Sequence, residues 1–450
     1  MSTTRHPPGP SLSPAAALGA FRRDPLGLLE RLASYGDITM LRIPRSNAYL
    51  LNHPELVRDL LVGGHRSFHK GPTVRAAKVL LGESLLTSEG ETHRRQRRLI
   101  QPMFHHERIA AYAGEMVRAA ERAGDRWRDG ETFDAHAEMG ALTLAVVGAT
   151  LFASDVDEAR SATVRRALTD ALGMFDRAYS PLFQVLVRLP SPTMRRYRRL
   201  EADLDRVIAE MIAERRRAGF GEDVLSLLLE AREDGIGMTD RQVRDEALTL
   251  FLAGHETTAN ALTWTWWLLS RHPGAEARLH AELDEVLGDA PPTFEDLPRL
   301  PYTSAVVAES LRLRPPSWAI GRTAVAEYRV GDVVIPAGST VVVSPWLLHH
   351  DSRWWSEPEV FRPERWLSED ADRPRDAFMP FGAGPRMCIG EPFARLEATL
   401  VLASIARTWR LVVPEGADPG LQPVVTLRPS GGLPVRSERR AAGSVREAIR

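Results

Sequence analysis

Residues 241–270, RQVRDEALTLFLAGHETTANALTWTWWLLS, have hydrophobic positions on nearly every side of a helix. A helix that is apolar all round lies inside a protein core. The longest apolar stretch, residues 141–153, is too short to cross a bilayer and indicates a second buried helix. Helical periodicity, interrupted by Gly or Pro, continues through most of the chain from residue 53 to Pro315 and Pro316. The pattern predicts a mainly helical protein.

Runs of β-branched residues predict a few short strands. Residues 38–52 are typical of two strands around a polar turn at 45–47. Residues 328–344 predict a hairpin, and residues 424–435 predict another that turns at 429–432.

The chain shows neither a fixed-period repeat nor a linker between regions of different composition. We therefore expect one domain over residues 1–450, mainly α with small β-sheets. A Pro-rich lead at residues 1–20 and a loose tail at residues 438–450 would flank it.

Composition and charge exclude several classes of protein. The 44% hydrophobic and 26% charged residues are typical of a soluble globular protein, and a net charge of -1 gives no reason to expect nucleic-acid binding. The single cysteine cannot form an internal disulfide, which favours a reducing compartment. Because residues 1–20 lack an apolar signal segment, we expect a cytoplasmic protein without a membrane anchor.

The only cysteine lies in a glycine-rich segment, residues 381–390, FGAGPRMCIG. The next residues, EPFARLEATLVLASIARTW, have the spacing of an amphipathic helix, so Cys388 would lie just before a helix amino terminus. Free N–H groups and the positive end of the helix dipole would stabilise a thiolate there. For a cysteine taken alone, an ordinary buried thiol is the better interpretation.

The middle of the long apolar helix is unexpectedly polar, with the sequence AGHETT. Gly254 weakens a helix, and the hydroxyl of Thr257 can bond to the carbonyl of Ala253 four residues earlier. Together they would open a small polar notch. The alternative is a buried helix that tolerates a polar patch.

Three further pairs or runs have little meaning when taken one at a time. Glu309 and Arg312 share a helix face, and FRPERW supplies Arg365 further along. His93 and Arg97 share another face within an arginine run. Charged groups of this kind most often lie on a solvated helix surface.

Residues 381–390 match the haem-binding loop of the cytochrome P450 family at every fixed position, and the other motifs follow in the family's order. The chain therefore resembles a cytochrome P450 over nearly its whole length. The resemblance implies the P450 fold, a triangular-prism-like domain with a long central helix over the haem. It also implies haem b, with Cys388 as the iron ligand, Phe381 packed near the sulfur, Arg386 on a haem propionate and Gly390 beside the cofactor.

The same resemblance gives roles to the other motifs. Thr257 would hold water on the oxygen-binding side, and Glu256 would help to relay protons, whereas His255 is given no catalytic role. Glu309, Arg312 and Arg365 would form a buried network beneath the haem loop. The remaining propionate partners would be His93, Arg97 and Arg322. His93 stands where many members have Trp, and Arg386 where many bacterial members have His.

By the same resemblance, the reaction is insertion of one oxygen atom from O2 into a lipophilic small molecule, by hydroxylation or epoxidation. A terpenoid, a polyketide and a fatty acyl chain, all typical of secondary metabolism, remain open as substrates. Residues 68–86 and a roof at residues 172–183 are candidate walls of the pocket. The single residues expected to contact substrate are Leu250, Ala253, Trp318, Ile320 and Leu433. Core packing would select similar apolar residues.

Electrons would come from separate proteins, a ferredoxin with its reductase or a flavodoxin-type carrier. Arg94, Arg95 and Arg98 would face outward and attract such an acidic partner. Three other functions stay open: a peroxide-driven or dehydrating P450, which would usually lack the Glu–Thr pair; a haem-binding sensor or carrier; and a cysteine hydrolase.

Overall fold

The computed structural model describes residues 7–43, 46–152, 192–367 and 374–440. The chain divides into two compact units. The first comprises Met1–Ala76, Leu311–Val360 and Glu369–Cys388, and the second Ala77–Ser310, Phe361–Ser368 and Ile389–Arg450. The mainly helical class with small sheets, predicted from the sequence, is confirmed.

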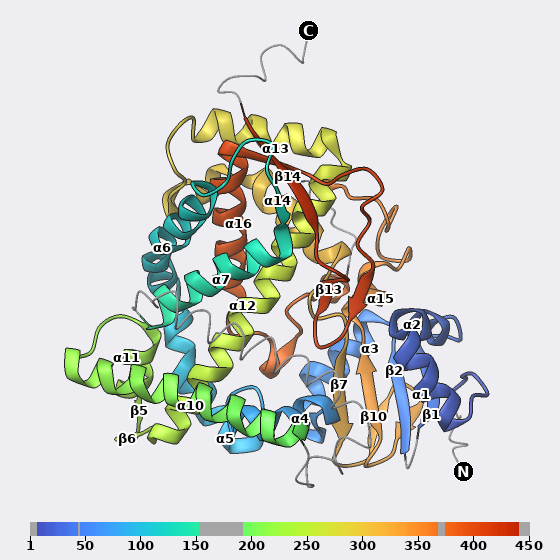
Figure 1. Cartoon of the computed structure of the whole chain (residues 1–450). Coiled ribbons are helices and arrows are strands. Elements are labelled where there is room, and N and C mark those ends of the chain that lie inside the picture. The colour runs from blue at the N-terminus through green and yellow to red at the C-terminus, as the bar shows by residue number, and fades with distance from the viewer. Residues whose placement is uncertain (1–6, 44–45, 153–191, 368–373, 441–450) are drawn as a thin grey trace, which may run out of the picture. The chain divides into compact units, whose positions relative to one another are not determined.

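The first unit is built on a five-stranded sheet with the strand order β1-β2-β10-β7-β3 (Figure 1). Strands β1 and β2 form the antiparallel pair predicted for residues 38–52. Tyr49, Leu51, Val341 and Val343 bury their side chains in the core of this sheet. The strands are β1 Ile38–Ile43, β2 Ser46–Leu51, β3 Phe68–Lys70, β7 Ile320–Ala324 and β10 Thr340–Val343.

Short helices accompany the sheet, and α1 and α2 lie beside β1. They are α1 Pro14–Arg23, α2 Pro25–Ala33, α3 Pro54–Arg58 and α15 Pro345–His349, and α4 Pro72–Leu81 follows β3.

The hairpin predicted over residues 328–344 is wrong in its second half. Strand β8 (Tyr328–Val330) pairs with β9 (Val333–Ile335) around a turn at Gly331, which has a positive φ of 52°. Strand β10 leaves this hairpin because it pairs with β2 on one side and β7 on the other.

The second unit is built around the 32-residue helix α12 (Asp240–Arg271), which confirms the helix predicted at residues 241–270. Thr239 and Gln242 close its amino terminus in a reciprocal capping box. Helices α7 (Ala135–Phe152) and α16 (Glu391–Thr408) pack against it (Figure 1). The approach of α7 is close, because a methyl group on Gly254 would lie 3.0 Å from Val147 Cγ2.

The other helices described in this unit are shorter than α12, and the last of them, α14, runs on into the first unit. They are α5 Gly90–Ile100, α6 His106–Gly124, α10 Pro192–Ala218, α11 Val224–Glu230, α13 Pro273–Val286 and α14 Pro301–Leu313. Its strands are β4 Thr132–Asp134, β5 Arg232–Glu233, β6 Ile236–Gly237, β11 Trp409–Val412, β12 Leu421–Pro423, β13 Leu427–Pro429 and β14 Pro434–Arg439.

The carboxy-terminal strands also differ from the prediction. The hairpin turns between β12 and β13, not at residues 429–432. Strand β14 instead joins a second sheet, where it lies between β11 and β4. The tail predicted from residue 438 therefore starts too early, because Glu438 and Arg439 pair with Arg410 and Trp409.

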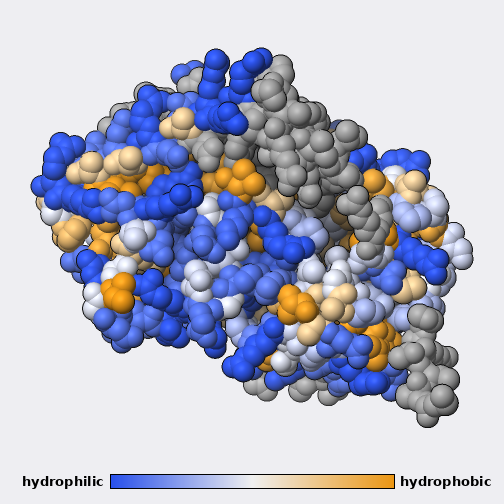
Figure 2. All heavy atoms as spheres, turned by 90° about the horizontal axis from the view of Figure 1, so that it is seen from below, coloured by the Kyte–Doolittle hydropathy of each residue, from blue (hydrophilic) through white to orange (hydrophobic). Residues whose placement is uncertain are grey.

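None of the helices in the described part of the chain has both the length and the apolar character to cross a membrane. The face drawn in Figure 2 is mainly hydrophilic, and hydrophobic residues appear on it in small, separate patches.

Candidate active site

The cysteine loop of the first unit is a tight, closed turn. The backbone N–H of Cys388 donates to the carbonyl of Phe381 at 2.9 Å, and the N–H of Met387 donates to that of Gly384 at 2.9 Å. Gly384 has a φ of +70°, and a Cβ at this position would lie 2.2 Å from the carbonyl oxygen of Leu61. Glycine is required here both by the backbone angle and by the close approach of Leu61. The loop ends at Cys388, which is exposed.

The segment before the loop is held by a buried histidine. His349 Nε2 accepts the backbone N–H of Met379 at 3.0 Å, so its Nδ1 carries the proton and donates to the carbonyl of Arg312 at 3.1 Å. The Arg312 guanidinium is fully buried and donates at 2.7 Å to the carbonyls of His349 and Pro358. Arg312 thus holds the backbone of His349, and the His349 side chain binds the backbone of Met379, two residues before the cysteine loop.

In the second unit, Glu309 and Arg365 form a buried ion pair. Arg365 Nε donates to Glu309 Oε1 at 2.9 Å, and the two side chains are 2% and 0% exposed. Glu309 also accepts the indole N–H of Trp366 at 2.9 Å. A surface pairing of Glu309 is excluded by this burial, whereas the three-residue network with Arg312 remains a prediction.

The polar notch in α12 has the local geometry expected from its sequence. Thr257 Oγ1 donates to the carbonyl of Ala253 at 2.6 Å. From α7, Thr143 Oγ1 donates to the carbonyl of His255 at 3.1 Å. Two carbonyls in this part of the helix therefore bind a hydroxyl group, and Ala253 is exposed.

Glu256, on the same turn as Thr257, is buried and bonded to a residue that sequence reasoning missed. Thr426 Oγ1, between β12 and β13, donates to Glu256 Oε1 at 2.7 Å. Asn260 Nδ2 donates to Thr426 Oγ1 at 3.1 Å, and His136 Nε2 lies 3.0 Å from Asn260 Oδ1. The four-residue spacing of Glu256 and Asn260 was a signal for a shared face, but Thr426 lies 170 residues further along the chain.

Helix α5 carries the two propionate partners predicted at His93 and Arg97. His93 is 4% exposed, and Arg97 is half-buried one turn later. In the first unit, Arg322 lies on β7, where its main chain pairs with Val341 and Lys70. Each of these residues is placed on a regular element of its own unit, and their contact with a propionate remains a prediction.

The arginines expected to face outward on α5 are largely paired with acids. Arg94 pairs with Glu91, and Arg98 Nε lies 2.6 Å from Glu233 Oε1. Arg95 is half-buried, lies 3.5 Å from Glu233, and donates to the carbonyl of Ile236 at 3.1 Å. Arg95 is thus only partly exposed, because its side chain also binds the β5–β6 hairpin.

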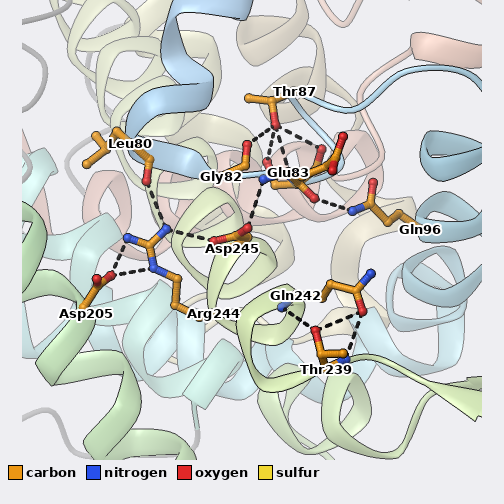
Figure 3. Close-up of polar contacts among 11 residues, drawn as sticks. Leu80, Gly82, Glu83, Thr87, Gln96, Asp205, Thr239, Gln242, Arg244 and Asp245 are labelled. Atoms are coloured by element: carbon orange, nitrogen blue, oxygen red, sulfur yellow. Dashed lines mark hydrogen bonds and ion pairs between the residues drawn. The ribbon is translucent and has the colours of Figure 1, made fainter. Parts of the chain in front are cut away.

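The loop after α4, within the predicted pocket wall at residues 68–86, is tied to the start of α12 (Figure 3). Asp245 Oδ2 accepts the backbone N–H of Glu83 at 2.9 Å. The fully buried Glu246 accepts the N–H of Leu85 at 2.9 Å. Gly82 packs so closely that a Cβ would lie 2.0 Å from Asp245 Oδ2.

Arg244 connects this loop to helix α10. Its guanidinium donates to Asp205 of α10 at 2.6 Å, to the carbonyl of Leu80 at 3.0 Å and to Asp245 at 2.9 Å (Figure 3). Hydrogen bonds to Asp205 and Asp245 raise the pKa of Arg244 against the opposing effect of burial. The Arg244 guanidinium therefore keeps its positive charge.

The predicted substrate contacts have different degrees of exposure. Ala253 is exposed, and Ile320 is half-buried with its Cδ1 3.6 Å from where a Cβ of Gly382 would lie, at the cysteine loop. Leu250, Trp318 and Leu433 are buried, as core packing alone would require. The predicted roof at residues 172–183 lies outside the described residues.

The side chains assigned to a haem fit that group chemically. In the first unit, the exposed thiol of Cys388 would be a suitable ligand for the haem iron, and Arg322 and Arg386 would be suitable partners for its carboxylates. In the second unit, His93 and Arg97 can hold carboxylates from one helix face. Gly390 immediately precedes α16, so the helix predicted after the cysteine loop is confirmed.

Comparison with known proteins gives one consistent family. The model of the cytochrome P450 family matches residues 17–432. Cyclooctat-9-en-7-ol 5-monooxygenase of Streptomyces melanosporofaciens is 44% identical over 87% of this chain and 86% of its own. Pentalenene oxygenase of Streptomyces avermitilis is 38% identical over 88% of this chain and 89% of its own. The crystal structure of the cytochrome P450DA haem domain matches with a TM-score of 0.87 at 27% identity, covering 98% of this chain and 99% of that one.

Proposed function

The chain belongs to the cytochrome P450 family, and from this premise we propose that it is a monooxygenase that hydroxylates or epoxidises a terpenoid. The observation that supports the substrate class most is the similarity to cyclooctat-9-en-7-ol 5-monooxygenase and pentalenene oxygenase, both of which cover most of the chain. The apolar side chains of Trp318, Ile320 and Leu433 agree with a lipophilic substrate.

Haem b is the cofactor in this proposal, and it supplies oxygen activation at its iron when bound. Cys388 is the iron ligand at the end of a loop whose backbone is closed by Phe381. In this proposal Arg322, Arg386, His93 and Arg97 are the residues that would bind the haem propionates. Gly384 keeps the loop compact enough to fix the sulfur.

Thr257 and Glu256 are the proposed proton-handling residues. The Thr257 hydroxyl donates to Ala253 at rest, so its oxygen is free to accept a hydrogen bond from water. Glu256 is a buried carboxylate on the preceding residue, where it can exchange a proton with that water. On α12, Ala253 lies one turn and Leu250 two turns before Thr257, and both border the substrate in this proposal.

Electrons come from a separate ferredoxin with its reductase, or from a flavodoxin-type carrier. The support is that Arg94 and Arg98 are exposed on α5, where they can meet an acidic protein. The cytoplasmic location predicted from the sequence belongs to the same proposal.

The test is turnover of the purified holoprotein with dioxygen and a ferredoxin system on cyclic terpenes, polyketides and fatty acids. We expect a thiolate-type ferrous carbonyl spectrum, lost in Cys388→Ser, and an oxygenated terpene as product. Thr257→Ala should still consume electrons but yield about a hundredfold less product per electron, because it lacks the proton-handling hydroxyl.

The other outcomes separate the remaining functions. Product formed only with peroxide would indicate a peroxygenase. A thiolate spectrum without any product would indicate a sensor or carrier. A colourless protein whose Cys388 is acylated would indicate a hydrolase. An oxygenated polyketide or fatty acid, with terpenes untouched, would overturn the substrate class alone.

A further inference from the structure

One face of α12 is bonded to the β12–β13 hairpin at three successive helical turns. Glu256 and Asn260 both bond to the Thr426 hydroxyl, at 2.7 and 3.1 Å. One turn further, Trp264 Nε1 donates to the carbonyl of Leu427 at 3.1 Å. Glu256 is 8%, Thr426 7% and Asn260 0% exposed. The hairpin and the helix therefore share a buried hydrogen-bonded seam whose first member is the Glu256 carboxylate.

When Glu256 is ionised, the chemistry of the groups fixes the direction of every hydrogen in this seam. A carboxylate only accepts, so the Thr426 hydroxyl donates its one hydrogen to Glu256. The Thr426 oxygen then accepts from the amide nitrogen of Asn260. The amide oxygen of Asn260 must accept in turn, so His136 donates from Nε2. Every donor in the series therefore points toward Glu256, and the hydrogen bonds strengthen one another and stabilise its negative charge.

The same series of hydrogen bonds, from His136 to Glu256, cannot carry a proton along its length. An amide such as that of Asn260 donates and accepts hydrogen bonds, but it does not gain and release protons at neutral pH. His136, which is half-buried at the outer end, therefore cannot feed protons to Glu256 through Asn260. The hydrogen-bonded series therefore sets the position and charge of Glu256 and does not supply it with protons.

We propose that Thr426 and Asn260 are positioning residues, which hold the Glu256 carboxylate ionised and in one orientation next to Thr257. This inference rests on the proposed role of Glu256 in oxygen activation. Without the Thr426 hydroxyl, a buried carboxylate oxygen loses a charge-assisted hydrogen bond, so Glu256 turns away or becomes protonated. Electrons would then be consumed with less oxygenated product.

The test uses the holoenzyme with terpene substrate and measures product per electron consumed, together with the solvent deuterium isotope effect. We expect Thr426→Val to lower the product per electron consumed, which we call coupling, about tenfold and to raise the isotope effect. A tenfold loss is typical when a residue that supports a reactive group is removed. Thr426→Ser, which keeps the hydroxyl, should restore both. Thr263→Val is the matched control, since this buried threonine donates to the carbonyl of Ala259 in its own helix at 2.7 Å.

A second variant keeps the inference testable if Thr426→Val does not fold. Asn260→Leu removes the next member of the series and should also lower coupling. The double variant should have the same coupling as Thr426→Val alone, because the two residues act on Glu256 as one unit. Unchanged coupling in both single variants, or a loss that Thr426→Ser does not restore, would overturn the proposal. A wild-type enzyme that forms no product would overturn it together with the monooxygenase assignment.

Discussion

At the scale of single residues, the most unusual group is the carboxyl of Glu397 on α16. Glu397 is fully buried, and burial raises its pKa well above the usual value, while the nearby Thr258 hydroxyl lowers it by less. The raised pKa means that Glu397 stays protonated in the folded protein. At a pH above the usual glutamate pKa and below the raised one, the folded protein therefore binds one more proton than the unfolded chain.

We predict that the protein becomes less stable as the pH rises from about 4.5 to the raised pKa of Glu397, because only the folded state has to keep this proton bound. In that window the free energy of unfolding falls by up to about 1.4 kcal/mol per pH unit through this group. Glu397→Gln should remove the slope and stabilise the protein at neutral pH.

Urea unfolding at a series of pH values measures this effect. Exposed Glu415→Gln serves as the control and should leave the slope unchanged. If Glu397→Gln and wild type lose stability in parallel between about pH 5 and pH 8, the carboxyl is ionised in the native state and the prediction is wrong.

Residue chemistry could be predicted from sequence where it depends on near neighbours. The bond from Thr257 to Ala253 spans one helical turn, so the sequence contained all the information needed. Thr426 could not be predicted as the partner of Glu256, because the contact depends on how a distant hairpin packs on α12.

At the scale of elements, the loop after α4 depends on the amino-terminal part of α12. Gly82 has a φ of +59°, and its missing side chain leaves room for Asp245, which binds the next backbone N–H. Gly288 offers a matched comparison, because it has a φ of +55° and a Cβ there would meet no described atom within 4 Å.

We predict that Gly288→Ala costs about 1 kcal/mol of unfolding free energy, the cost of a left-handed backbone for a residue with a Cβ. Gly82→Ala should cost about 1–3 kcal/mol more, because its Cβ would displace Asp245. Denaturant unfolding measures the stability, and the spin-state change on terpene binding should show weaker affinity for Gly82→Ala alone. Equal costs for the two variants would mean that the loop moves away freely and that Asp245 does not hold it.

The sequence predicted which segments form strands, but not always which strands pair with each other. The two antiparallel strands within residues 38–52 were correctly predicted because they are neighbours in the sequence, but Ser46 and Asn47 belong to β2 and not to the predicted turn. For residues 328–344, strand β10 finds better partners in β2 and β7 than in its neighbour β9, and no local pattern contains that information.

At the scale of the whole molecule, a net charge of -1 produces little long-range attraction for an acidic redox partner. Attraction must come from local clusters, and the clearest one described is on α5. There Glu233 opposes the positive charge, since it pairs with Arg98 at 2.6 Å.

We predict opposite effects from the two members of this pair. With a ferredoxin at low ionic strength, Arg98→Gln should slow reduction and Glu233→Gln should speed it, each by about three- to tenfold. Stopped-flow reduction at several salt concentrations measures this, and both effects should shrink as salt screens the charges. Peroxide-supported turnover is the control and should stay constant. Rates that change equally at all salt concentrations would indicate damage to the fold.

Strand β14 is paired on one side with β4, where Pro434 pairs with Asp134, a residue 300 positions earlier in the chain. At about 5–20 residues per second, a ribosome needs roughly 15–60 s to make the residues in between. Throughout that time β4 has emerged but lacks its partner, and an unpaired strand edge invites association with other chains. Synthesis of this protein in a foreign host should therefore gain from slow expression and abundant chaperones, which shelter β4 until the last strand arrives.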